Sequence, residues 1–171
     1  MIENNRIFRL PILLLAILTL IGAAWAGLLR LGWDWPALHI ELHAIHGPLM
    51  ISGFLGTLIG LERAVAIGKR WAYIGPLVNG LGGLLLALGA PQLIGQIFLI
   101  VGSLWMVLIF SVILRQHLTS YTIVMALGAA ALVMGNLLWL FGWDIHRFVL
   151  WWAGFLILTI AGERLELSRI R

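Results

Sequence analysis

The chain has 171 residues, of which 62% are hydrophobic and only 11% are charged. Because a soluble domain carries about 25% charged residues, this composition excludes a soluble globular protein and predicts an all-α integral membrane protein. The absence of cysteine excludes disulfides, thiolate metal sites, iron–sulfur clusters and covalently attached c-type haem.

Apolar segments of spanning length predict six transmembrane helices in contact with a lipid bilayer. The first, from Ile12 to Leu29, is long enough to cross the bilayer and is expected to be a span rather than a cleaved signal peptide. Because the connections are short, residues 1–171 are expected to form a single polytopic membrane domain. The helices are predicted at about 10–30, 46–66, 72–90, 93–114, 120–141 and 146–162.

The positions of Lys and Arg predict the orientation. With the N-terminus inside, nine basic residues fall on the inner side and two, Arg30 and Arg147, on the outer side. This bias predicts a multi-pass protein of the cytoplasmic (inner) membrane of a prokaryote, with both termini cytoplasmic. Because the basic residues gather in loops on one side, the net charge of +4 does not indicate a nucleic-acid partner.

The outer loop, residues 31–45, is predicted to contain a short amphipathic helix. Pro36 suits a first helical turn, so the outer amphipathic segment is expected over 36–46, with Trp33 and Trp35 at headgroup level. Pro48 cannot donate a hydrogen bond to the carbonyl of Ala44, so a kink or break is expected at Gly47–Pro48.

Three of the five histidines, His39, His43 and His46, lie in one stretch of eight residues in this region. If they belong to one helix, His39, His43, His46 and Met50 follow spacings of four, three and four residues and lie within about 60° of one another. Imidazole binds copper, zinc and haem iron, and a thioether favours Cu(I) or haem. The pattern therefore predicts haem b or copper binding. Two alternatives stay open: no cofactor, with histidine as the polar face of an interfacial helix, or a pH sensor.

Parts of the sequence repeat. Leu28–Asp34 resembles Leu137–Asp144, and the nine-residue interval from Gly53 to Glu62 recurs from Gly154 to Glu163. Helices one–two and five–six are thus expected to be copies of one hairpin, with a four-helix period that eight helices would complete. The histidine segment lies in the nine residues by which the first copy is longer.

The repeat brings further residues into the candidate site. His146 stands at the outer start of the sixth helix, so it is a fourth candidate metal ligand. Asp34 and Asp144 are candidates for accepting hydrogen bonds from the histidine rings and fixing their tautomers.

Small and polar residues indicate how the helices pack. Ser52, Gly56 and Gly60 recur every four residues, which favours close helix packing, with a flat wall for a planar cofactor as the alternative. Asn79 and Asn136 are expected to form interhelical hydrogen bonds rather than a ligand site.

Two Glu-Arg pairs end the second and sixth helices on the inner side. Glu62 with Arg63, and Glu163 with Arg164, are expected either as ion pairs or proton-relay groups or, more simply, as arginines that reach the lipid phosphates beside exposed glutamates.

The segment from His43 to Phe54, with its His-Gly-Pro-Leu-Met-Ile-Ser-Gly-Phe run, resembles the start of a helix in the NnrS family of membrane proteins. Those proteins are associated with nitric oxide stress and are thought to carry haem and copper. The segment is also similar, more loosely, to the haem-ligating helix of haem-copper oxidases. The resemblance covers about residues 39–63 and implies His43, His46 and Met50 as haem or copper ligands. Because both families have more helices, a full oxidase reaction is not implied.

These observations predict a membrane protein that binds haem or copper on the outer side, for electron transfer or for nitric oxide or metal handling. One alternative is a non-catalytic subunit or scaffold that docks a partner through glycine-rich helix faces, as a homo-oligomer or in a larger membrane complex. A second alternative is a small transporter. No enzymatic reaction is assigned.

Overall fold

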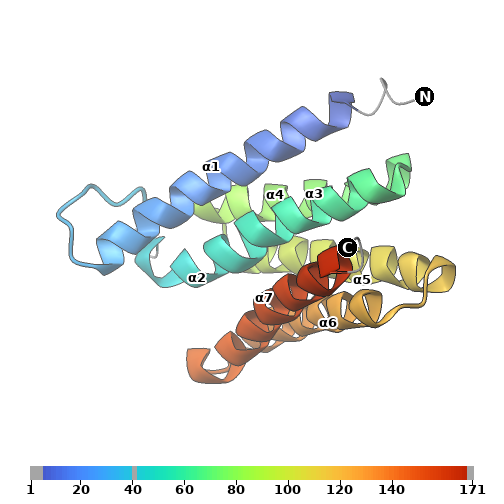
Figure 1. Ribbon diagram of the computed structural model, residues 1–171. Coiled ribbons are helices and arrows are strands. Elements are labelled where there is room, and N and C mark those ends of the chain that lie inside the picture. Colours follow the sequence, from blue (N-terminus) through green and yellow to red (C-terminus); the bar gives the residue numbers. More distant parts are fainter. Residues whose placement is uncertain (1–5, 40–41, 169–171) are drawn as a thin grey trace. The chain divides into compact units, whose positions relative to one another are not determined.

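The computed structural model describes residues 6–39 and 42–168 (Figure 1). The described chain is helical and contains no strand, which confirms the all-α class. It divides into two compact units, residues 1–102 and 103–171, and each is described by itself. A single polytopic domain stays a prediction.

Within the described residues, five helical segments are long and apolar enough to cross a membrane. They are α1 (Arg6–Arg30), the continuous segment Leu42–Ile67, α5 (Gln92–Gln116), α6 (Ser120–Leu140) and α7 (Ile145–Ser168). The segment Leu42–Ile67 contains η2 (Leu42–Ile45), α2 (His46–Pro48), η3 (Leu49–Leu55) and α3 (Gly56–Ile67). A sixth helix consists of the 3₁₀ turn η4 (Arg70–Tyr73) followed by α4 (Ile74–Ala87).

Helix α1 buries one stripe of mostly small residues in unit 1. The stripe recurs every three or four residues, the spacing of a single helical face, and packs against α4, η3 and α3. Alanine and threonine here let neighbouring backbones come close, which is how helices associate where lipid offers no hydrophobic driving force. The stripe consists of Ile12, Ala16, Thr19, Ala23 and Ala26.

Three helices meet at Thr19, Gly53 and Gly83. A Cβ on Gly83 would lie 3.0 Å from Cα of Gly53 and 2.7 Å from the Thr19 methyl carbon. The two glycine backbones therefore touch directly, with the threonine methyl group filling the remaining space. Gly53 of the second helix therefore serves helix packing, and the same role for the face of Ser52, Gly56 and Gly60 stays a prediction.

The helix does not break at Pro48, although its hydrogen bonding changes there. A 3₁₀ turn over η2 is followed by one α turn and then by the π-helix η3, so Leu42–Ile67 is continuous. Proline removes one N–H from the ladder, and the change of helix type accommodates this loss without ending the helix.

The predicted interhelical bonds of both asparagines are present. Asn79 Nδ2 donates to the carbonyl of Ser52 in the π-helix at 2.5 Å, linking α4 to η3. In unit 2, the indole N–H of Trp152 donates to Asn136 Oδ1 at 3.1 Å, and Asn136 Nδ2 donates to Ser103 Oγ at 3.3 Å. Both asparagines are buried, and their side-chain N–H groups bond within the protein, whereas Asn79 Oδ1 has no hydrogen-bond partner among the described residues.

Helices α6 and α7 lie side by side in unit 2 (Figure 1). Gly135 leaves room for the indole of Trp152, and Gly162 leaves room for Met125. Phe148 packs edge-on against the same indole at 4.9 Å between centroids. Glycine on each helix thus receives a large side chain from the other.

The similar segments Leu28–Asp34 and Leu137–Asp144 end their helices in the same way. Gly32 and Gly142 have φ of 86° and 71°, which suits glycine. In α1, the N–H groups of Gly32 and Trp33 donate to Leu29 and Leu28, and α6 has the same pattern at Gly142 and Trp143. This is the Schellman cap. It supports the repeat, which itself stays a prediction.

Gly83→Ala is expected to destabilise the protein because its Cβ meets a backbone atom of Gly53, which cannot rotate away. We expect a loss of about 1–3 kcal/mol in the free energy of unfolding, the usual cost of overpacking. Thermal unfolding in detergent measures it. Gly154→Ala is the control, because its nearest neighbour is Ala131 Cβ at 3.8 Å. Equal unfolding temperatures for the two variants would contradict the contact.

Candidate functional site at the histidine loop

The outer loop is fastened to α1 by tryptophans. The indole N–H of Trp25 donates to the carbonyl of Pro36 at 3.1 Å, and its ring packs on Trp35 with centroids 4.7 Å apart. Trp33 meets Trp35 edge-on at 5.6 Å. These contacts hold the chain as it leaves α1 and turns back toward η2.

The amphipathic helix predicted over 36–46 is not seen in the described residues of that range. Residues 33–37 have no regular structure, and a helical turn begins only at Leu42. Proline disfavours the α conformation in the residue before it. The carbonyl of Pro36 accepts a hydrogen bond from Trp25 and so is not available to a helix. Residues 40 and 41 lie outside the described chain.

The three histidines do not lie on one helical stripe. His39 precedes the helix, His43 is exposed on η2, and His46 is half-buried at the start of α2. Within the described ranges, no group of three or more His, Cys, Asp or Glu side chains is arranged to hold a metal ion. Metal binding by the three histidines together stays a prediction.

His46 is held against the backbone of α1. Its Nδ1 lies 2.7 Å from the carbonyl oxygen of Ala23, which can only accept, so Nδ1 carries the proton in this bond. The ring lies over Gly27, where an added Cβ would come within 3.0 Å of Nδ1 and Cε1. The bond fixes the tautomer and leaves Nε2 with its lone pair.

An open groove borders the His46 ring. It encloses about 610 Å³ and is mostly apolar. Its only charged lining residue among those described is Arg30, at the C-terminal end of α1. The groove combines an oriented imidazole, apolar walls and one cation. It is lined by Ala24, Gly27, Leu28, Arg30, Leu31 and His46.

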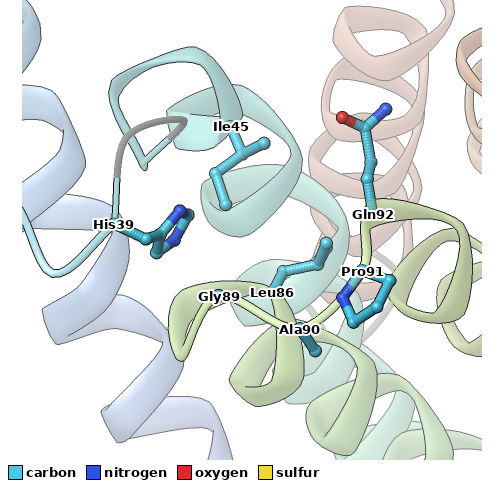
Figure 2. Close-up of a pocket in the computed structure, with 7 residues that line it drawn as sticks. All are labelled: His39, Ile45, Leu86, Gly89, Ala90, Pro91 and Gln92. Carbon is cyan, nitrogen blue, oxygen red and sulfur yellow. The ribbon is translucent and has the colours of Figure 1, made fainter.

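His39 lies in a separate cavity, at the turn between α4 and α5 (Figure 2). Its ring packs over Gly89, and its Nε2 is buried with no hydrogen-bond partner in the part of the chain that the structure describes. The histidine loop therefore serves two cavities, with His46 in one and His39 in the other.

The remaining candidates lie in the π-helix η3, in the outer loop and in unit 2. Met50 is half-buried in the π-helix, and Asp34 is exposed. Asp144 and His146 are both exposed at the start of α7, in unit 2. Their participation in a metal site stays a prediction.

The inner Glu-Arg pair of the second helix is present. Arg63 Nη2 lies 2.7 Å from Glu62 Oε1, but the side chain of Arg63 is 10% exposed and that of Glu62 is 58% exposed. The arginine is therefore the buried member and does not reach outward as expected. In α7, Glu163 is half-buried and Arg164 is exposed.

Sequence reasoning missed the residues of α1 that complete the groove. Arg30 was counted only for orientation, and Gly27 was not considered. The available signal was the set of small residues Ala23, Ala24, Ala26 and Gly27 on either side of Trp25 near the end of the first span, which permits another side chain to approach the backbone.

A family model described as a domain of unknown function, DUF8744, matches residues 9–171, so the chain belongs to this family. A search of curated proteins found no match, and a search of solved structures found none either.

Trp25→Phe is expected to loosen the outer loop, because it keeps an aromatic ring but removes the hydrogen bond to Pro36. A net loss of about 1 kcal/mol corresponds to roughly fivefold faster amide exchange where exchange follows local opening. Hydrogen exchange of residues 31–39, followed by mass spectrometry, measures this. Trp151→Phe, at an exposed position of α7, is the control. Unchanged loop exchange in Trp25→Phe would contradict the anchoring role.

Proposed function

We propose that this protein is a multi-pass membrane protein that binds haem b through His46 at the outer end of α1. The single observation that carries the proposal is the 2.7 Å contact between His46 Nδ1 and the Ala23 carbonyl oxygen. Ligating histidines usually donate their second ring N–H in this way, which orients the ring and raises its basicity. The iron of haem b would supply one-electron exchange or nitric oxide binding.

The groove beside His46 fits the shape and polarity of such a group. Ala24 and Gly27 present little side-chain volume to a flat ring, and Leu28 and Leu31 provide apolar contact. Arg30 stands at the end of the groove, and a guanidinium pairs well with a carboxylate of the kind haem carries. The same residues would keep water from one face of the ring.

The geometry favours haem over copper. A tightly bound copper ion needs several nitrogen or sulfur ligands around one point. His46 offers one oriented nitrogen, whereas His43 is exposed and His39 lines a different cavity. A single axial histidine with an apolar groove is instead sufficient to hold a haem. Electron transfer and nitric oxide handling are the functions consistent with a haem held by a single histidine.

The scaffold alternative loses part of its support. Gly53, Gly80 and Gly83 lie on glycine-rich helices, but each is in close contact with another helix of unit 1. Those glycine positions are used inside the fold and are closed to an external helix.

We further propose six spans with both termini cytoplasmic. Four residues of η4 and 14 of α4 rise by about 8 Å and 21 Å, and their sum of about 29 Å matches a hydrocarbon core of about 30 Å. An even number of spans returns the C-terminus to the side of the N-terminus. The nine-to-two distribution of basic residues supports the cytoplasm as that side.

Protein purified from cells supplied with haem is expected to show a Soret band that His46→Ala removes. Losing an axial ligand should lower haem retention at least as much as losing an orienting partner does, roughly 10–100-fold. Gly27→Leu should also lower retention, since its side chain would occupy the ring position of His46. The measurement is the oxidised and reduced absorbance spectrum with haem quantification.

His43→Ala is the matched control, because it removes a neighbouring but exposed histidine. It should retain the full band. A colourless wild-type protein, or equal haem content in His46→Ala and His43→Ala, would overturn the assignment of His46.

The cysteine-free sequence allows a direct test of orientation. Leu38→Cys, in the exposed outer loop, should react with a membrane-impermeant maleimide in intact spheroplasts. Lys69→Cys, exposed in the loop after α3, should react only after permeabilisation. The reverse labelling pattern would show the opposite orientation.

A further inference from the structure

The cavity that His39 enters is built from four parts of unit 1. His39 comes from the outer loop, Ile45 from η2, Leu86 from α4, and Gln92 from the start of α5, with the turn Gly89–Pro91 between the last two (Figure 2). The cavity encloses about 390 Å³. This lies within the range of small-molecule sites, about 300–1,000 Å³.

His39 lines this cavity and carries an unused polar atom. Its Nε2 is buried and has no hydrogen-bond partner within the described part of the chain. Buried polar atoms are nearly always satisfied, so a bound molecule with one hydrogen-bonding atom could supply the partner that this nitrogen lacks among the described residues. Gly89, with φ of 83°, closes the turn and leaves room for the His39 side chain, since an added Cβ would lie 3.2 Å from Cβ, Cγ and Cδ2 of His39.

The lining restricts the chemistry of that partner. Ile45, Leu86 and Pro91 are apolar, and no Asp, Glu, Lys or Arg is among the described lining residues. Gln92 adds an amide at the exposed rim. A charged ligand would find no counter-charge here, whereas an uncharged ring with a hydrogen-bonding oxygen would suit both the walls and Nε2.

We propose that this cavity binds the headgroup of a membrane quinone or quinol, with His39 Nε2 hydrogen-bonded to one of its oxygens. A protonated Nε2 donates to a quinone carbonyl, and an unprotonated one accepts from a quinol hydroxyl, so both redox forms find a partner.

The surroundings of the cavity favour a ligand from the bilayer over one from water. Leu88, Leu93 and Ile94 adjoin the lining residues in sequence and are 70%, 57% and 42% exposed. These side chains flank the turn between α4 and α5, where an isoprenoid tail could lie along them. The proposal concerns binding alone and does not depend on haem at His46.

Full-length protein in quinone-free lipid nanodiscs, titrated with decylubiquinone, tests the proposal. Saturable binding above that of empty nanodiscs is expected, measured by calorimetry. His39→Leu should weaken it by roughly tenfold, because the headgroup oxygen loses its partner. Ala90→Phe should weaken it comparably by filling the cavity while leaving His39 in place, and thermal unfolding confirms that each variant is folded.

A matched control separates a loss at His39 from a general effect of removing a histidine. His43→Leu, at an exposed position of η2, should bind decylubiquinone as the wild type does. The proposal is overturned if the wild type binds no more than empty nanodiscs, or if both His39→Leu and Ala90→Phe bind normally. A tailless benzoquinone that binds as tightly as decylubiquinone would overturn the membrane origin of the ligand.

Discussion

The direct contact between the backbones of Gly53 and Gly83 determines how unit 1 is arranged. Lipid gives helices no hydrophobic reason to associate, so close packing and polar bonds must hold them. With no side chain on either glycine, α4 comes near enough for Asn79 to reach the Ser52 carbonyl. The segment before Gly53 is thereby held beside the outer end of α1. The position of His46 over Gly27 depends on this arrangement.

The π-helix explains how a proline and a polar bond occupy the same stretch. A π turn closes an i→i+5 hydrogen bond and takes in about one residue more than an α turn, which rotates the preceding segment by about 100° relative to an ideal α-helix. The wider turn also exposes backbone carbonyls, and the Ser52 carbonyl is used by Asn79. Thus the turn that accommodates Pro48 also resets the faces presented by η2 and α2.

The hydrophobic pattern predicted the helices, because a membrane helix depends on the length of an apolar segment. The asparagine bonds and the close approach at glycine were also predictable, because they depend on small or polar residue types. The prediction of a histidine stripe was wrong, because it assumed one α-helical register from His39 to Met50. The structure replaces that register by a loop, a 3₁₀ turn and a π-helix. Long-range contacts, such as Trp25 with Pro36 and His46 with Ala23, decide these changes, and no local pattern encodes them.

The two half-buried histidines of this region are packed in the same way but are proposed to bind different ligands. Each ring lies on a glycine from another part of the chain, His46 on Gly27 and His39 on Gly89. In His46 the backbone of α1 already binds one nitrogen, so the ring is oriented before any ligand arrives, as suits a metal ligand. In His39 the buried Nε2 has no partner in the described chain, as suits a hydrogen bond to an incoming molecule. Because these roles require different surroundings, the separation of the two rings is consistent with two distinct sites rather than one disrupted metal cluster.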